Sequence, residues 1–349
     1  MKNFEQVCRL VRQGLDDGAY PSACLSVGIR GSVCVRQTFG PARETTLYDI
    51  ASLSKIVGTT MIAFRFLEEG RLRLYDTVEQ FFPAPEDKKG ITVLQLMTHT
   101  SGLPAHFYLS EEADGPGDAV RAILAHPLEH APGALPVYSC MGYILLGRIL
   151  EQIGGQSIDR LAQEYVFEPL GLTHTTYRPA GDVAPTERDP ATGELLRGAV
   201  HDENARFLGG LSGNAGIFSD LCDMTRFVQM LALGGKLPDT QFLSPATLRA
   251  ALVNRTPGAG HEFRGLGFNL AGSPSNFLGD LMSPRAYGHT GFTGTSIAVD
   301  PDTGLFVVLL TNRVCPTREN GKLIRMRSLI HNAAAAAAGR MQQEAPPWN

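Results

Sequence analysis

Strand-type sequence lies at both ends of this chain, and mostly helical sequence lies between them. Residues 23–29 and 33–39 are two β-type runs separated by a glycine-containing turn, which predicts a hairpin near the amino end. Residues 295–299 and 305–311 flank a turn rich in Asp, Pro and Gly, which predicts a second hairpin near the carboxyl end. The pattern therefore favours an α/β chain whose one sheet is made from both ends, with a helical lobe inserted between them.

We interpret residues 1–349 as a single domain with two lobes. The sheet lobe is expected to take about residues 1–60 and 285–349, and the mainly helical lobe about residues 61–284. Apolar spacing and capping residues predict helices after the amino terminus and over residues 52–69, 93–98, 141–153, 157–166, 220–233, 244–252 and 321–339. We expect a third short strand over residues 46–50, an irregular segment over 105–135 and a long ordered loop over 178–216.

The composition is typical of a soluble globular protein. Of 349 residues, 43% are hydrophobic and 19% charged, and the formal net charge is −4, which gives no reason to expect nucleic acid or an anionic membrane as a partner. The first helix alternates apolar and charged residues, unlike the apolar core of a signal peptide, and no window is long enough to span a membrane. We therefore expect a cytoplasmic chain.

The cysteines give no sign of a metal site. All six are widely spaced and none forms a C-x-x-C pair, so the spacing of a structural zinc site is absent. We expect free thiols, as in a reducing compartment. A metal hydrolase that uses histidines is the weakest of our hypotheses, because no pair shows ligand spacing on a helix; the histidines considered are His99, His106, His126, His130 and His201.

A hydroxyl and an amine stand together at the start of an apolar segment. Ser52 and Lys55 are three residues apart, so one helical turn places them on the same face. Burial tends to lower the pKa of a lysine, and a lysine with a depressed pKa beside a serine is a known way to activate the hydroxyl. The alternative is a solvated lysine, which the apolar surroundings make a poor fit.

Two further stretches look chemical. Tyr138 stands two residues before Cys140, just ahead of a predicted helix, where its hydroxyl can point into a cleft; a buried tyrosine with a satisfied hydroxyl is the alternative. His289, Thr290 and Gly291 begin a strand with closely spaced glycines, which indicates a close approach of backbone to another group, or a tight turn.

Taken together, Ser52-x-x-Lys55, Tyr138-x-Cys140 and His289-Thr290-Gly291 resemble, in order and spacing, the motifs of the penicillin-binding-protein and class C β-lactamase superfamily. The resemblance covers most of the chain. Further stretches are similar to the β-lactamase-related serine hydrolase branch, namely residues 98–103, 142–151, 201–205 and 213–218. The resemblance implies a β-lactamase/transpeptidase-like fold, with a central antiparallel sheet flanked by helices.

The same resemblance implies a role for each residue. Ser52 would be the nucleophile that forms an acyl-enzyme, Lys55 would ease its deprotonation, and Tyr138 would be the general base, a phenol that needs a nearby cation to ionise at neutral pH. The backbone N–H groups of Ser52 and Phe292 would form the oxyanion hole. Substrate would lie along Cys140, His289, Thr290 and Gly291. The resemblance implies no cofactor and no metal.

Two departures point away from an efficient β-lactamase. Relatives that bind β-lactams well often carry lysine at the position of His289, and a histidine is mostly neutral at pH 7. The second motif usually ends in asparagine, whereas a thiol at Cys140 is a weak donor and acceptor. We therefore expect an esterase or a D-amino-acid peptidase or amidase, acting on a small ester, amide or peptide. The alternatives are a class C-type β-lactamase, a D-Ala-D-Ala carboxypeptidase, or a catalytically weak binding or sensor protein.

Overall fold

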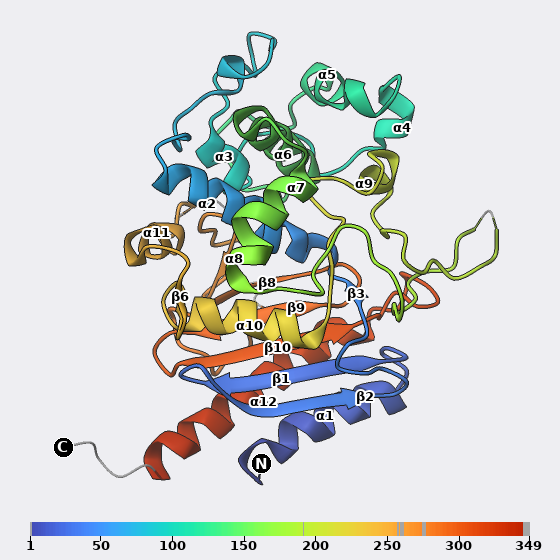
Figure 1. The fold of residues 1–349 in the computed structure, drawn as a ribbon, viewed down its shortest axis with the longest axis vertical. Helices are drawn as coiled ribbons and strands as arrows, with labels where there is room; N and C mark the ends of the chain where they lie inside the picture. Colours follow the sequence, from blue (N-terminus) through green and yellow to red (C-terminus); the bar gives the residue numbers. More distant parts are fainter. Residues whose placement is uncertain (1, 191, 257, 259–261, 274–276, 345–349) are drawn as a thin grey trace.

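A six-stranded antiparallel sheet runs through the centre of the computed structural model, and its strands come from both ends of the chain (Figure 1). The structure describes residues 2–190, 192–256, 258, 262–273 and 277–344. The strand order is β2-β1-β10-β9-β8-β7. The strands are β1 (Ala23–Ile29), β2 (Ser32–Phe39), β7 (Asn269–Leu270), β8 (Tyr287–Thr290), β9 (Ser296–Asp300) and β10 (Leu305–Thr311).

The two ends of the chain meet where β1 pairs with β10. Ala23 lies opposite Thr311, and Ile29 lies opposite Leu305. Every residue of β10 is buried, which explains its apolar run over residues 305–310, because a strand covered on both faces cannot alternate with polar residues. The predicted hairpins β1–β2 and β9–β10 are both confirmed.

Helices cover both faces of the sheet. The terminal helices α1 (Glu5–Asp16) and α12 (Lys322–Glu344) pack together on one face, and α10 (Leu221–Ala232) packs on the other. The apolar stripe of α1 places Val7 and Val11 in the core, where full burial of such a side chain stabilises the fold by about 1.5–3 kcal/mol.

Most of the remaining helices lie beyond α10, in the upper part of Figure 1. The largest is α6 (Cys140–Gly154), which begins at the N-cap Ser139, whose side chain accepts a hydrogen bond from the N–H of Gly142. The others are α2 (Met61–Glu68), α3 (Val93–Met97), α4 (Leu109–Glu112), α5 (Ala119–Ala125), α7 (Ile158–Ala162), α8 (Glu168–Leu170), α9 (Glu203–Phe207) and α11 (Pro245–Ala251). We propose the two-lobe division on this arrangement; residues 1 and 345–349 of the expected domain lie outside the described residues.

Two local expectations are wrong. The segment over residues 105–135 is not irregular, because it contains α4 and α5, and the loop over 178–216 contains α9. Helices this short are held by tertiary contacts rather than by a periodic pattern: the Asn204 side chain on α9 accepts a hydrogen bond of 2.8 Å from the backbone N–H of Leu109 on α4.

The third strand is shorter than residues 46–50 and lies outside the central sheet. It is β3 (Tyr48–Asp49), paired with β4 (Phe218–Ser219). The backbone carbonyl groups at its end accept hydrogen bonds from threonine side chains instead of from a strand. The Asp49 carbonyl accepts from the Thr293 hydroxyl at 2.7 Å, and the Ile50 carbonyl accepts from the Thr295 hydroxyl at 3.0 Å. Across the described ranges, no helix is both long enough and apolar enough to cross a membrane.

Candidate active site

Ser52 lies on a short 3₁₀ turn, Ala51–Leu53, where the chain leaves β3. The helix expected over residues 52–69 is not one regular α-helix, because a π-helical segment, Lys55–Thr60, follows this turn before α2 begins. Such π-helical turns are rare and occur frequently at functional sites. Ser52 and Lys55 nevertheless meet as their spacing predicts, with Ser52 Oγ 3.1 Å from Lys55 Nζ.

The Lys55 ammonium is buried and held by three uncharged acceptors. Its Nζ donates to the backbone oxygen of Asn214 at 2.9 Å, to Ser52 Oγ at 3.1 Å and to Cys140 Sγ at 3.5 Å, which uses its three protons. Burial lowers the pKa of Lys55, whereas Cys140 and Tyr138 in their ionised forms, together with the charge of Asp202, raise it, and the balance is a raised pKa. The depressed pKa expected from burial is therefore wrong, and Lys55 is a cation at neutral pH.

Tyr138 places its aromatic ring against the same ammonium. The centre of the Tyr138 ring lies 5.0 Å from Lys55 Nζ and 4.4 Å from the centre of the His99 imidazole ring. The Tyr138 hydroxyl is buried, and within the described residues it has no hydrogen-bond partner of regular geometry. Burial raises the pKa of Tyr138, and Lys55 and Ser52 oppose that rise without cancelling it. Lys55 is thus the cation that favours the phenolate form of Tyr138.

Cys140, the first residue of α6, faces Lys55 with its thiol. Burial raises the pKa of Cys140, although Lys55 opposes the rise, so the group is a neutral thiol at pH 7. A thiol sulfur is a weak acceptor, so this contact holds the ammonium less firmly than a side-chain amide oxygen would.

His289 provides no positive charge to the site. It is buried on β8, and its Nδ1 lies 2.8 Å from the backbone oxygen of Thr290, which can only accept. Nδ1 therefore carries the proton, and Nε2 has no partner in the described part of the chain. Burial, followed by the charges of Arg264 and Lys55, holds the pKa of His289 well below its ordinary value.

The turn after β8 is tied closely to the Ser52 turn. Besides the two threonine hydroxyls that bond the carbonyl groups of Asp49 and Ile50, Gly291 packs against the Ile50 backbone so tightly that a Cβ would lie 2.4 Å from its oxygen. This confirms the close backbone approach predicted for the glycines. In the described residues the backbone N–H groups of Ser52 and Phe292 donate no hydrogen bond, so both are free donors.

One cavity of about 300 Å³ contains several of the expected residues. Ser52, Tyr138, Cys140 and Phe292 line it, and Lys55 lies directly behind Ser52. The expected substrate residues on β8 are not among its lining residues. A larger cavity of about 700 Å³ lies between α11 and β7, and it shares no lining residue with the cavity of Ser52.

The spacing of residues in the sequence did not identify the other residues that line the Ser52 cavity. They come from the two segments whose helices the sequence did not predict and from the chain after β10: His106, Tyr108, His201, Asp202, Glu203, Ala215 and Arg318. For residues 201–203 a signal existed, because the stretch 201–205 is one of those similar to known serine hydrolases.

Asp49 positions the turn that carries Ser52. This buried carboxylate accepts a hydrogen bond from the N–H of Ala51 at 2.8 Å with Oδ1, and from the N–H of His201 at 2.7 Å with Oδ2. It thereby ties the residue before Ser52 to the segment that forms a cavity wall. Ala51 has φ +49°, a region that a non-glycine residue enters only at some cost in energy.

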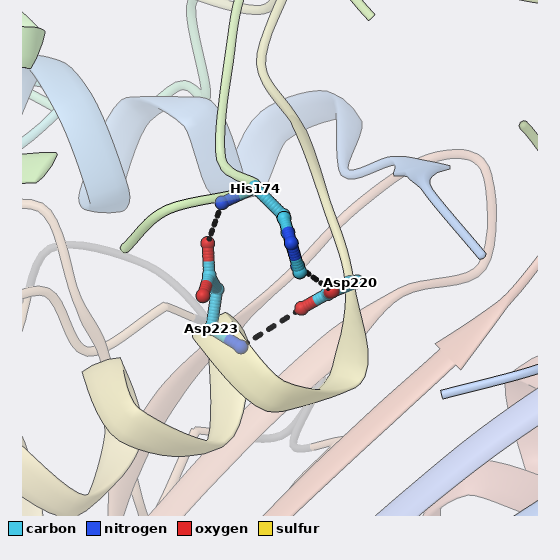
Figure 2. Close-up of side chains that lie close together, drawn as sticks. All are labelled: His174, Asp220 and Asp223. Carbon is cyan, nitrogen blue, oxygen red and sulfur yellow. Dashed lines mark hydrogen bonds and ion pairs between the residues drawn. The ribbon is translucent and has the colours of Figure 1, made fainter. Parts of the chain in front are cut away.

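A separate cluster of side chains has residue types that bind metal ions, and none of the five histidines considered from the sequence belongs to it. In the described chain it is the one group of three or more His, Cys, Asp or Glu ligand atoms close enough together: His174, Asp220 and Asp223 (Figure 2). Its atoms already have protein partners. His174 Nδ1 lies 2.6 Å from Asp220 Oδ2, Asp220 Oδ1 caps α10 through the N–H of Asp223, and Asp223 Oδ2 accepts from the N–H of His174 at 2.7 Å. The cluster is a helix cap rather than a vacant ligand set.

Replacing His174 with glutamine is expected to lower the free energy of unfolding in a pH-dependent way. The hydrogen bond with Asp220 raises the pKa of His174, so the protonated form stabilises the fold; this contribution is complete below about pH 6.5 and is lost as pH rises through the raised value. Because the side chain is 52% exposed, the effect is about 0.5 kcal/mol. Urea unfolding at pH 5.5 and pH 9 measures it.

The matched control for this change is His130→Gln, at an exposed histidine for which the structure records no ion pair. An equal loss of stability at both pH values in His174→Gln, or the same pH dependence in the control, would contradict the assignment of the charge pair.

A family model described as Beta-lactamase matches residues 7–330 of the chain. A relative from Escherichia coli (strain K12), whose name reads "Putative D-alanyl-D-alanine carboxypeptidase", is 30% identical over 363 aligned positions, which cover 90% of this chain and 83% of the relative.

Two solved structures are similar to this chain in fold. EstCE1, described as a hydrolase with promiscuous acyltransferase activity, has a TM-score of 0.76 at 22% identity, over 94% of this chain and 98% of its own. An octameric penicillin-binding protein homologue from Pyrococcus abyssi has a TM-score of 0.73 at 23% identity, over 93% of this chain and 76% of its own. The fold expected from the sequence motifs is thereby confirmed.

Proposed function

Since the chain belongs to the beta-lactamase family, we propose that it is a serine hydrolase that works through an acyl-enzyme on Ser52. Its substrates are carboxylic esters, or amides and peptides of D-amino acids, and its activity on β-lactams is weak or absent. The observation that carries this proposal is the 3.1 Å contact between Ser52 Oγ and the buried Lys55 Nζ at a cavity wall.

In the proposed reaction, Ser52 Oγ attacks the carbonyl carbon of the substrate while its proton passes to the minor phenolate form of Tyr138. Burial raises the pKa of Tyr138, and the Lys55 ammonium opposes that rise and so supports this form. The negative charge that develops on the carbonyl oxygen is held by the free N–H groups of Ser52 and Phe292, since donors fixed in advance stabilise a transition state without reorganisation. Tyr138 then returns the proton to the leaving group, and water releases the acyl group by the same route.

The electrostatics of the site support a preference against β-lactams. A β-lactam carries a carboxylate, and the β8 residue where relatives often have lysine is the neutral His289. The strongest alternative is a D-Ala-D-Ala carboxypeptidase, which the name of the Escherichia coli relative favours.

A fluorophosphonate probe tests the acyl-enzyme proposal. We expect one covalent adduct by intact mass, mapped to Ser52 by peptide digestion. Labelling of another residue, or no labelling at all, would sink the proposal. Rates on phenyl acetate, a chromogenic cephalosporin and a D-Ala-D-Ala peptide then rank the substrate classes; a cephalosporin or peptide rate far above the ester rate would replace our choice with the corresponding alternative.

Replacing Cys140 with asparagine is expected to change ester hydrolysis by less than about tenfold. The variant exchanges one weak contact with Lys55 for one ordinary hydrogen bond, and a net hydrogen bond is worth about 1 kcal/mol, where 1.4 kcal/mol is tenfold in rate. The measurement is kcat/KM on phenyl acetate for both proteins. A gain of a hundredfold or more would instead indicate a site whose chemistry has decayed, as in a binding or sensor protein.

A further inference from the structure

The wall of the Ser52 cavity carries an excess of negative charge. Its lining includes two carboxylates, Asp202 and Glu203, against one guanidinium, Arg318. That guanidinium is already engaged: its Nη2 donates to Glu203 Oε1 at 2.6 Å, and its Nε donates to Glu187 Oε2 at 2.7 Å. Among the described lining residues, no cation is therefore left free to pair with an anionic group of a substrate.

Only one of the two carboxylate oxygens of Asp202 accepts a hydrogen bond from the described residues. Its Oδ1 caps α9 by accepting a hydrogen bond of 2.8 Å from the N–H of Ala205. Its Oδ2 has no hydrogen bond or ion pair within the described residues, although the side chain lines the cavity. The negative charge of Asp202 also contributes to the raised pKa of both Lys55 and Cys140, so it acts within the site itself.

An aromatic ring adds to this environment. Tyr108 lines the same cavity and is 43% exposed. The face of such a ring attracts a cation, and so does a carboxylate oxygen with a free lone pair. A positively charged amine is the group that both features favour.

We propose that Asp202 Oδ2 binds a protonated primary amine on the acyl part of the substrate. The preferred substrates are then esters or amides of amino acids whose amine is unblocked. This inference rests on the proposed acyl-enzyme function and narrows it, because N-acylated peptides and simple anionic substrates lack the group that Asp202 recognises.

The test compares the phenyl esters of alanine, as both enantiomers, with their N-acetyl derivatives at pH 6.5, where the amine is protonated. We expect the wild-type kcat/KM to favour the free amine by about tenfold to a hundredfold, the range of a hydrogen bond between charged partners. Equal rates on the free and acetylated esters of both enantiomers would overturn the inference.

The variant Asp202→Asn keeps the helix cap, because asparagine caps as well as aspartate, and removes the charge. It should lose the preference for the free amine, so that the ratio of kcat/KM on the free-amine ester to kcat/KM on its acetylated counterpart falls to about one. Asp239→Asn, which removes the same charge from an exposed ion pair elsewhere, is the control and should keep the preference. A loss shared equally by all esters in Asp202→Asn would contradict recognition of the amine.

A binding measurement tests amine recognition by Asp202 independently of acyl-enzyme formation on Ser52. Alaninamide is titrated calorimetrically into Ser52→Ala, with and without Asp202→Asn. We expect at least fivefold weaker binding in the double variant. If the probe fails to label Ser52, the acyl-enzyme proposal fails; if the probe labels but alaninamide binds both variants equally, only the inference on Asp202 fails.

Discussion

Replacing Ser52 with alanine is expected to abolish probe labelling and to lower ester hydrolysis by about 10³-fold or more, since loss of a serine nucleophile costs up to about 10⁶ in well-studied hydrolases. The fold should be unaffected. Ser52 is only half-buried, and among the described residues Lys55 is the one side chain that makes a hydrogen bond of regular geometry with its hydroxyl. The measurements are intact mass after probe treatment, kcat/KM on phenyl acetate and the thermal midpoint.

The matched control is Ser157→Ala, at an exposed serine ahead of α7. It should label and hydrolyse as the wild type does. A Ser52→Ala protein that still forms the adduct would remove Ser52 from the reaction and with it the proposed function.

Replacing Lys55 with methionine is expected to lower ester hydrolysis by about 10²–10⁴-fold while lowering the free energy of unfolding by no more than about 1–3 kcal/mol. Methionine has a similar shape and removes a buried charge that no carboxylate contacts directly, but it leaves the buried backbone oxygen of Asn214 without its donor. Without the ammonium, Tyr138 loses the cation that favours its phenolate, and proton transfer of this kind contributes about 10²–10⁴ to a rate. Ester kinetics and urea unfolding supply the two readouts.

The unequal sizes of these two effects, a large loss of rate and a small loss of stability, distinguish a catalytic from a structural lysine. A variant that loses several kcal/mol of stability along with its activity would indicate that Lys55 mainly holds the fold. Lys55→Arg keeps the charge but not the geometry, since a planar guanidinium cannot point three donors as an ammonium does. It should therefore fail to restore the rate.

The sheet could be predicted from the sequence because its strands carry strong local signals. The hairpins β1–β2 and β9–β10 follow from apolar runs and turn residues, and β10 is apolar up to its last residue because both faces are covered. The contact between Ser52 and Lys55 also follows from spacing, even though the turn is 3₁₀ rather than α, because a 3₁₀ turn has three residues per turn and so places residues three apart on one side.

The rest of the site depends on tertiary contacts that leave no periodic signal. Nothing in the sequence around Asp49 indicates a special role for it. Only the fold shows that both of its carboxylate oxygens accept hydrogen bonds from backbone N–H groups. The same holds for α4 and α9, which are joined by Asn204. The pKa of Lys55 was predicted with the wrong sign, because the sequence shows burial but not the groups that surround the ammonium.

The threonine bonds to the Ser52 turn have a consequence for how the protein is made. Thr293 lies 244 residues after Asp49, whose carbonyl it holds, and synthesis on the ribosome proceeds from the amino end. The serine is therefore translated early, but its turn is fixed only once β8, β9 and β10 have left the ribosome. A growing chain thus carries its serine in an unformed turn, and the site is completed almost at the end of translation.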